Sequence, residues 1–217
     1  MPVKSWDRPH GVPEATSERL SLVLRGLRAL EAEGVHTVSS YQLADRFGLN
    51  PAQIRKDLAQ FGEFGVRGVG YRVADLKAKL KQLMGLERTR TVVIAGAGNL
   101  GQALADSRNF NVDGFKVAAL FDVDGRKIGG RSRTGVPILD LKELPSNVAT
   151  LKADIGVLAV PAEAALEVAR LVAGAGVPAI LNFAPVSVPS LEGTFVRNVD
   201  LTFFLENLSF QLAVRRR

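Results

Sequence analysis

A glycine-rich loop has the residue types and spacing that point most clearly to a chemical task. It directly follows an apolar, β-branched segment at residues 91–95 and precedes a helical segment from about residue 99 to 107. In such a strand–loop–helix unit the first glycine permits a tight turn, the second lets the backbone approach a pyrophosphate, and the third lets the helix pack on the strand. Unpaired amides at the helix N-terminus then attract the pyrophosphate. The predicted dinucleotide contacts are Gly96, Ala97, Gly98, Asn99, Leu100 and Gly101.

An acidic residue stands where such a unit needs one. A second apolar segment, residues 115–121, ends at Asp122, about 20 residues beyond the loop. Its carboxylate is expected to accept hydrogen bonds from the adenosine ribose hydroxyls and to repel a 2′-phosphate. Asp122 therefore favours NAD(H) over NADP(H), with Arg126 and Lys127 close behind it as the opposing signal.

The following residues repeat this alternation of strand and helix. We expect strands over 154–160 and 178–182, with an alanine-rich helix over 162–173 between them. The carboxyl ends of the strands border the ligand cleft in a doubly wound sheet. This places Val160, Pro161, Asn182 and Phe183 on the nicotinamide side of the predicted cofactor site, although each also fits plain core or turn.

No catalytic constellation accompanies the predicted cofactor site. Hydride-transfer enzymes need an acid–base group beside the nicotinamide, but His10, His36, Tyr41 and Tyr71 all precede the nucleotide half and cysteine is absent. No spacing resembles a metal site either. We predict a non-enzymatic protein in which the cofactor is a signal. The alternatives are an NAD-dependent oxidoreductase with a basic N-terminal module and a CoA-binding protein, because CoA-binding domains share this topology.

Charge is distributed unevenly along the 217 residues. Residues 1–90 carry 15 Lys and Arg against 10 Asp and Glu, whereas residues 91–217 carry 13 against 12. A basic module joined to a neutral one is typical of a protein that binds a polyanion. The composition is globular, no apolar run approaches the ~20 residues of a membrane span, and no signal peptide is evident. We therefore expect a cytoplasmic protein that does not enter a membrane.

The basic part contains a helix-turn-helix pattern. An amphipathic helix is expected over 14–32 and ends at Gly34. Ser39 and Gln42 then fit a capping box, with Gly48 as the stop. Asn50-Pro51-Ala-Gln53 supplies an N-cap, a proline at the first helical position and a capping glutamine for the next helix. The short, glycine-containing gap between these two helices is that of a helix-turn-helix.

The second of these helices has a face suited to DNA. Ile54, Leu58 and Phe61 form a buried stripe, and the long polar side chains lie away from it. Residues 62–73 are expected to form a β-hairpin, with residues 69, 71 and 73 alternating toward one face, so that the whole resembles a winged helix. A short helix through Leu76, Leu80 and Leu83 follows, closed by Gly85. The predicted DNA contacts are Ser39, Gln53, Arg55, Lys56, Gln60, Arg67 at the hairpin tip, and Tyr71.

The last segment, residues 198–212, reads as a strongly apolar helix. It needs a partner surface, either its own sheet or a second subunit. The predicted fold is therefore α/β, with an N-terminal winged helix-turn-helix at 1–84, a Rossmann domain at 85–198, and a C-terminal dimerisation helix at 199–217.

Several of these motifs together resemble the Rex family of redox-sensing transcriptional repressors. They run in order as Arg55-Lys-Asp-Leu58, Phe61-Gly62, Gly65, Gly68-Val-Gly70-Tyr71, Gly96–Gly101, Phe121-Asp-Val-Asp124, Asn182-Phe-Ala-Pro-Val186 and Asn198-Val-Asp200. The resemblance implies a homodimer with a swapped C-terminal helix. It also implies binding to inverted-repeat operator DNA, and release when NADH outcompetes NAD+. By position it assigns Arg25 and Asp200 to interdomain coupling. A tyrosine of some relatives is replaced here around Ser107 or Arg108.

The expected mechanism follows from this resemblance. Two recognition helices would lie in successive major grooves, ~34 Å apart. NADH carries a neutral dihydronicotinamide, and an apolar pocket lined by Phe183, Phe203 or Phe204 would favour it over the cationic ring of NAD+. Closure of the dimer around NADH would then move the recognition helices out of register.

Overall fold

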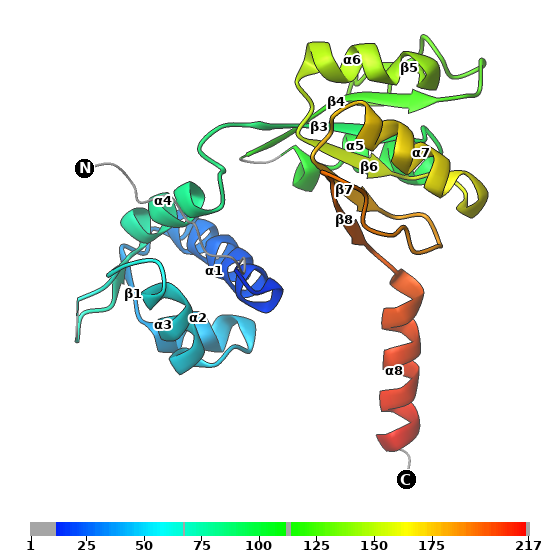
Figure 1. Ribbon diagram of the computed structural model, residues 1–217. Coiled ribbons are helices and arrows are strands. Elements are labelled where there is room, and N and C mark those ends of the chain that lie inside the picture. Colours follow the sequence, from blue (N-terminus) through cyan, green and yellow to red (C-terminus); the bar gives the residue numbers. More distant parts are fainter. Residues whose placement is uncertain (1–11, 67, 112–113, 216–217) are drawn as a thin grey trace. The chain divides into compact units, whose positions relative to one another are not determined.

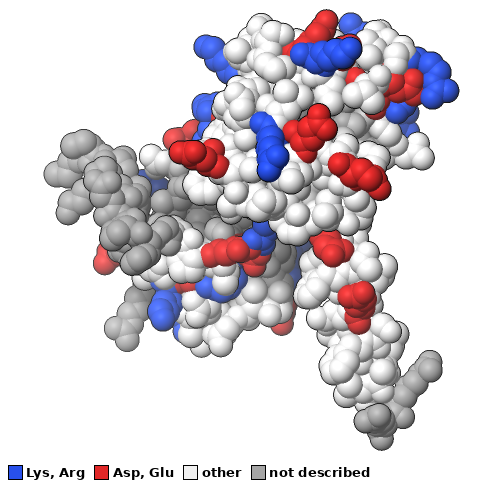
Figure 2. All heavy atoms as spheres, turned by 45° about the vertical axis from the view of Figure 1, so that its right-hand side comes forward, with Lys and Arg blue, Asp and Glu red and all other residues white. Residues whose placement is uncertain are grey.

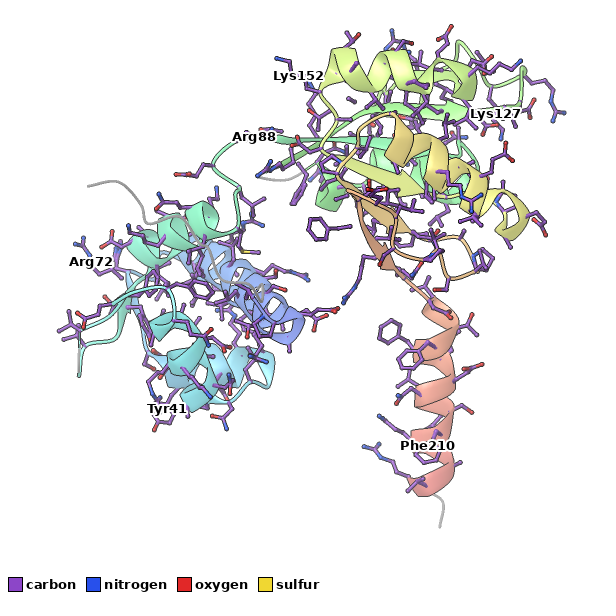
Figure 3. All side chains as sticks on the ribbon, in the orientation of Figure 1. Tyr41, Arg72, Arg88, Lys127, Lys152 and Phe210 are labelled. Atoms are coloured by element: carbon purple, nitrogen blue, oxygen red, sulfur yellow. The ribbon has the colours of Figure 1, made fainter. Side chains whose placement is uncertain are left out.

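The computed structural model describes residues 12–66, 68–111 and 114–215 (Figure 1). The chain divides into two compact units, Met1–Glu87 and Arg88–Arg217. The division falls slightly beyond the boundary expected after residue 84, and the C-terminal helix groups with the second unit. Arg88, labelled in Figure 3, opens the second unit, where Asp154 accepts hydrogen bonds from Arg88 Nη1 at 3.1 Å and Arg90 Nη1 at 3.0 Å.

The first unit contains the predicted helices in the predicted order. Its elements are α1 (Glu14–Ala32), β1 (Thr37–Val38), α2 (Ser40–Phe47), α3 (Pro51–Ala59), β2 (Tyr71–Arg72) and α4 (Val73–Leu83). The capping box at the start of α2 is present, because the Ser39 side chain accepts from the Gln42 N–H and the Gln42 side chain accepts from the Ser39 N–H. Gly48 ends α2 with a left-handed φ of 62°. These caps confirm the helix-turn-helix prediction.

Helix α3 begins as predicted, except for one side chain. Asn50 Oδ1 accepts hydrogen bonds from the Ala52 and Gln53 N–H groups. The capping role predicted for the Gln53 side chain is wrong, because its Nε2 donates forward to Asp57 Oδ1 at 2.7 Å. Ile54 is buried as expected.

The wing is shorter than the predicted hairpin. Val66 and Gly70 exchange two backbone hydrogen bonds of 3.0 Å as an isolated bridge, and β2 pairs with β1 in an antiparallel register. The expected strand alternation stops at Val73, which is the first residue of α4; its N–H donates to the His36 carbonyl and its side chain is buried. Arg67, predicted at the tip, lies outside the described residues.

The second unit is built on one parallel sheet, as predicted for a Rossmann domain. Its elements are β3 (Arg90–Ala95), α5 (Asn99–Asp106), a 3₁₀ turn η1 (Arg108–Phe110), β4 (Phe115–Asp122), β5 (Ile138–Asp140), η2 (Leu141–Glu143), α6 (Leu144–Leu151), β6 (Ile155–Leu158), α7 (Ala162–Gly174), β7 (Ala179–Asn182), β8 (Phe195–Asn198) and α8 (Leu201–Arg215). The strand order is β5-β4-β3-β6-β7-β8. The order reverses between β3 and β6, which is the switch point where doubly wound sheets bind ligands.

Both faces of this sheet are covered by helices. On β3, Val93 and Ala95 belong to the core that includes residues of α6 and α7, whereas Val92 and Ile94 belong to the core that includes Ala105 of α5. Burial on both faces explains why the strand reads as a continuous apolar run in the sequence.

No part of the chain that the structure describes covers helix α8. All its described residues are exposed, including large apolar side chains that are 55% to 70% exposed. Figure 3 labels Phe210 among them, and Figure 2 shows the helix as an almost uncharged surface. The alternative in which this helix packs on its own sheet is therefore not realised in the single chain. No helix in the described ranges is both long and apolar enough to cross a membrane.

Asp106, at the end of α5, holds the loop that leads into β5, and this leads to a prediction about pH. Its carboxylate accepts hydrogen bonds from Thr134 Oγ1 and Ser132 Oγ and from the Thr134 and Arg133 N–H groups, which lower its pKa from 3.8 to about 2. This stabilisation is complete above the unfolded pKa of 3.8 and is lost as the pH falls through about 2.

We therefore expect Asp106→Asn to lower the free energy of unfolding near neutral pH, and this deficit to shrink as the pH falls from about 5 toward 2. Urea unfolding at a series of pH values measures the deficit. Glu167→Gln, at an exposed position on α7, is the matched control, and its free energy of unfolding relative to the wild type should not change in this way with pH. A deficit for Asp106→Asn that does not change with pH would contradict the prediction.

Candidate functional site

The glycine loop forms an open cradle at the carboxyl end of β3. Gly96 has a φ of 101°, and a Cβ there would lie 2.3 Å from the Ala159 carbonyl oxygen. A Cβ on Gly101 would lie 1.8 Å from the Gly96 oxygen. Gly98 differs, because no heavy atom outside it and its two chain neighbours lies within 4 Å of its Cβ position. The loop is therefore packed on its inner side and open at the N-terminus of α5, which fits a pyrophosphate on the helix amides.

Asp122 joins the end of β4 to this loop. Its Oδ2 accepts the Ala97 N–H at 2.8 Å and the Lys127 ammonium at 3.1 Å, and its Oδ1 accepts the Asp124 N–H at 2.9 Å. Burial alone would raise the pKa of Asp122, but these hydrogen bonds bring it below its usual value. An ionised carboxylate has about four lone-pair sites, so Asp122 keeps acceptor capacity for ribose hydroxyls.

Two cations follow Asp122 in the sequence. Lys127 contacts the Asp122 carboxylate, whereas Arg126 is paired with another residue. Arg126 Nη2 donates to Asp124 Oδ2 at 2.8 Å and its Nε donates to Asp124 Oδ1 at 3.0 Å. Asp124 therefore compensates the charge of Arg126. This arrangement supports the expected preference for a ribose without a 2′-phosphate.

The four residues predicted on the nicotinamide side differ in their exposure and in the parts of the protein that they contact. Val160 follows β6 and lies against the loop, with its Cγ1 3.3 Å from the Cβ position of Gly96. Pro161 is exposed at the start of α7, and Phe183 is half-buried after β7. Asn182 is fully buried.

The Asn182 side chain is occupied within the protein. Its Nδ2 donates to the Val186 carbonyl and to Asn198 Oδ1, both at 2.8 Å, and its Oδ1 accepts the Ala184 N–H at 3.0 Å. These bonds hold the turn after β7 and tie it to the end of β8. The side chain of Asn182 thus clamps this turn, and a contact of Asn182 with the cofactor stays a prediction. Among the residues in view, no group of three or more His, Asp or Glu is arranged to hold a metal ion.

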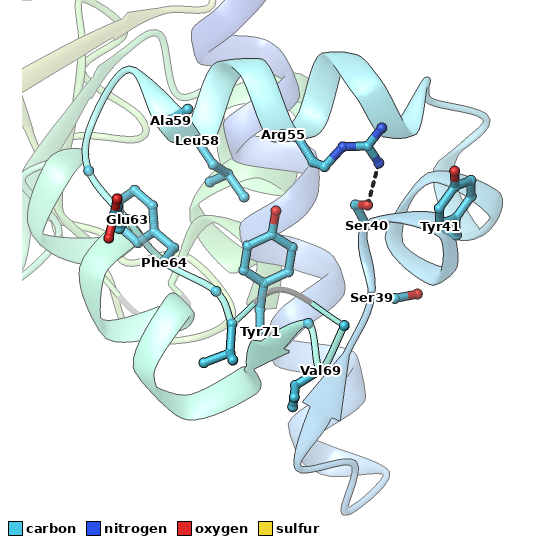
Figure 4. A pocket seen from close by; sticks show the side chains of 15 residues that line it. Ser39, Ser40, Tyr41, Arg55, Leu58, Ala59, Glu63, Phe64, Val69 and Tyr71 are labelled. Atoms are coloured by element: carbon cyan, nitrogen blue, oxygen red, sulfur yellow. Dashed lines mark hydrogen bonds between the residues drawn. The ribbon is translucent and has the colours of Figure 1, made fainter.

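The first unit contains a cavity of about 800 Å³ between the start of α2, helix α3 and the wing (Figure 4). It brings together the predicted DNA contacts Ser39, Arg55 and Tyr71. Lys56 on α3 and Gln60, the C-cap of α3, are exposed but do not line the cavity.

Two residues that sequence reasoning missed hold Arg55 in this cavity. Arg55 Nη1 donates to Ser40 Oγ at 2.8 Å, and the guanidinium lies 5.6 Å from the centre of the Tyr41 ring (Figure 4). Such pairing orients the guanidinium before any ligand arrives. The signal was present in the sequence, because Ser40 and Tyr41 are the first residues of a strongly capped helix. Burial raises the pKa of Tyr71, so its hydroxyl remains a hydrogen-bond donor at neutral pH.

The two residues predicted to couple the domains lie in different units. Arg25 is exposed on α1. Asp200 is exposed directly before α8 and caps it, because Asp200 Oδ1 accepts the Thr202 N–H at 2.8 Å and the Phe203 N–H at 3.3 Å. The capping is a structural finding, and the coupling stays a prediction.

Known proteins and protein families are similar in sequence to both units of this chain. A family model described as "CoA binding domain" matches residues 87–186, and one described as "Putative DNA-binding protein N-terminus" matches residues 11–59. The redox-sensing transcriptional repressor Rex of Desulforamulus reducens is 46% identical over 95% of this chain and 98% of its own length. Rex of Syntrophomonas wolfei is 48% identical over the same shares.

Solved structures agree with these relatives. RSP in complex with β-NAD+ and operator DNA is 35% identical, with a TM-score of 0.88 over 95% of each chain. RSP in complex with β-NADH is 33% identical, with a TM-score of 0.84 over 95% of this chain and 97% of RSP.

Proposed function

This chain belongs to the Rex family of redox-sensing transcriptional repressors, and we propose that it binds inverted-repeat operator DNA as a homodimer and releases it when NADH binds. The DNA contacts come from Ser39, Gln53, Arg55, Lys56, Gln60 and Tyr71 in the first unit. The NADH contacts come from the loop Gly96–Gly101, Asp122, Val160, Pro161, Asn182 and Phe183. Because it acts on DNA in response to a metabolic cofactor, we place it in the cytoplasm.

The observation that carries the proposal is the pairing of two prepared sites in one chain. The carboxylate of Asp122 closes an open glycine loop by accepting the Ala97 N–H at 2.8 Å. The guanidinium of Arg55 is oriented by Ser40 beside a capped recognition helix. The polar side chain of Asn182, at the carboxyl end of the sheet, forms hydrogen bonds within the protein. This combination suits a ligand-controlled DNA-binding protein better than an enzyme.

Selectivity for the reduced cofactor would come from apolar residues. When bound, the cofactor would differ between its two oxidation states in the charge of its nicotinamide ring, which is neutral in NADH and cationic in NAD+. Phe183 is half-buried after β7, and Phe203 and Phe204 are exposed on α8, with their rings edge to face and their centroids 5.6 Å apart. A second subunit that covers α8 would bring such rings into an apolar environment, where a cationic nicotinamide is costly to desolvate.

The effect of NADH on DNA affinity can be measured by fluorescence anisotropy. The labelled inverted-repeat duplex is first recovered by selection on the full-length protein. NADH should raise the Kd for this duplex by roughly tenfold or more, which corresponds to a coupling free energy of about 1–3 kcal/mol between the two sites. NAD+ and NADPH should have much smaller effects. Weakening by NAD+ without weakening by NADH would refute the proposal.

A second candidate, CoA binding, is favoured by the family model that matches residues 87–186. Isothermal titration with NADH and with CoA separates the two candidates, since both ligands carry a pyrophosphate but only NADH carries a second ribose and a nicotinamide. Turnover of NADH with small carbonyl substrates, measured in parallel, would instead favour an oxidoreductase. We expect tight binding of NADH, no binding of CoA and no turnover.

A further inference from the structure

A buried ion pair ties the recognition helix α3 to helix α1. The side chain of Asp57 is 1% exposed, with Oδ2 at 2.5 Å from Arg19 Nε and Oδ1 at 3.0 Å from Arg19 Nη2. Burial by itself would raise the pKa of Asp57, but hydrogen bonds from Arg19 and Gln53 hold it below its usual value. The carboxylate therefore stays charged inside the protein, where a charge needs well-placed partners.

The same carboxylate fixes the amide of Gln53. Gln53 lies one turn before Asp57, and its Nε2 donates to Asp57 Oδ1 at 2.7 Å. A glutamine side chain is flexible when solvated, but one committed N–H leaves its second N–H and its Oε1 in a set orientation. Gln53 is only half-buried. It lies in the first turn of α3, three residues after the cap residue Asn50.

The position of Gln53 is the one from which such a helix reads bases. The N-terminal residues of a recognition helix contact base edges in the major groove. Glutamine reads adenine with one donor and one acceptor in the same plane, so the plane must be oriented correctly. An amide that is already held loses less side-chain freedom when it binds.

We propose that Asp57, held in place by Arg19, is a positioning residue for DNA recognition that orients the Gln53 amide to read one base pair in each half-site. This rests on the proposed function, because it requires α3 to enter the groove. An ion pair that serves packing alone would weaken binding to every DNA sequence equally. A positioning residue removes discrimination at one base pair and leaves the others unchanged.

Selection from duplexes randomised over about 20 base pairs, enough for two half-sites one helical turn apart, tests this with the full-length protein. The wild type should prefer one base at the position read by Gln53 by roughly tenfold. Asp57→Ala and Gln53→Ala should each flatten that preference, and the double variant should be no flatter than Gln53→Ala alone. Asp45→Ala, at an exposed site on α2, is the matched control and should retain the full preference.

Thermal unfolding and NADH titration check that each variant is folded, and NADH binding should be unchanged. Should Asp57→Ala fail to fold, Arg19→Gln loosens the same carboxylate and should flatten the same position partially. Equal loss at all positions, or further flattening by Asp57→Ala when Gln53 is already alanine, would overturn the inference. If the wild-type protein enriches no sequence at all, the proposed function itself fails.

Discussion

Replacing Gly98 with alanine should remove most of the NADH affinity while leaving the fold intact, which yields a repressor that no longer leaves its operator. The backbone of Gly98, with φ −75° and ψ −173°, is open to alanine, and no heavy atom beyond its two chain neighbours lies within 4 Å of the added Cβ. The methyl group would instead occupy the open side of the cradle, where the helix amides meet the pyrophosphate. Losing one charge-assisted hydrogen bond costs about 2–3 kcal/mol, which raises the Kd on the order of 100-fold.

Isothermal titration measures the loss of NADH affinity, and thermal unfolding measures the fold. The free energy of unfolding should change by no more than about 1 kcal/mol, the scale of a helix N-cap substitution. Gly101→Ala is the contrasting variant. Its Cβ would lie 1.8 Å from the Gly96 oxygen, so it should destabilise the unit itself. A Gly98→Ala protein that binds NADH like the wild type would show that the pyrophosphate does not lie in this cradle.

The features that were predicted correctly from the sequence are those determined by neighbouring residues. The capping box of Ser39 and Gln42, the left-handed stop at Gly48 and the glycine loop each need only a few adjacent positions. Helix α1 was also predicted correctly, because its apolar side chains recur at helical spacing from Leu20 to Leu30. Local signals of this kind gave the fold class and the position of the cofactor loop.

The features that were missed depend on residues far apart in the chain. Strands β5 and β8 and helix α6 were not predicted, and β8 is recognised as a strand only because it pairs with β7. Asn182 has the right type and place for a ligand contact, and only the fold reveals Asn198 as its partner. Gln53 was read as a cap, whereas the Asp57 that holds it is fixed by Arg19, 38 positions away. Side-chain roles of this kind are decided by tertiary contacts.

The second large effect is expected from helix α8, whose apolar surface none of the described residues covers. A helix that is apolar on all sides is normally buried. Its charged residues between Leu201 and Arg215 are Glu206 and Arg215 alone. A second copy of the chain would cover this surface and would place two recognition helices on one operator. The double substitution Phe204→Asp and Leu208→Asp should therefore convert the dimer to a monomer, because two buried carboxylates would face the partner without counter-charges.

Monomerisation should cost DNA affinity far more than any single contact does. Binding of a second half-site within one dimer is an intramolecular step, and linkage of this kind raises affinity by roughly 10²–10⁴-fold. The Kd for an inverted-repeat duplex should therefore rise at least about 100-fold in the double variant. A duplex that carries a single half-site is the internal control, and both proteins should bind it with similar weak affinity because the first unit is unchanged. Sedimentation equilibrium measures the oligomeric state. A variant that remains dimeric, or that binds the full operator as tightly as the wild type, would assign α8 another role.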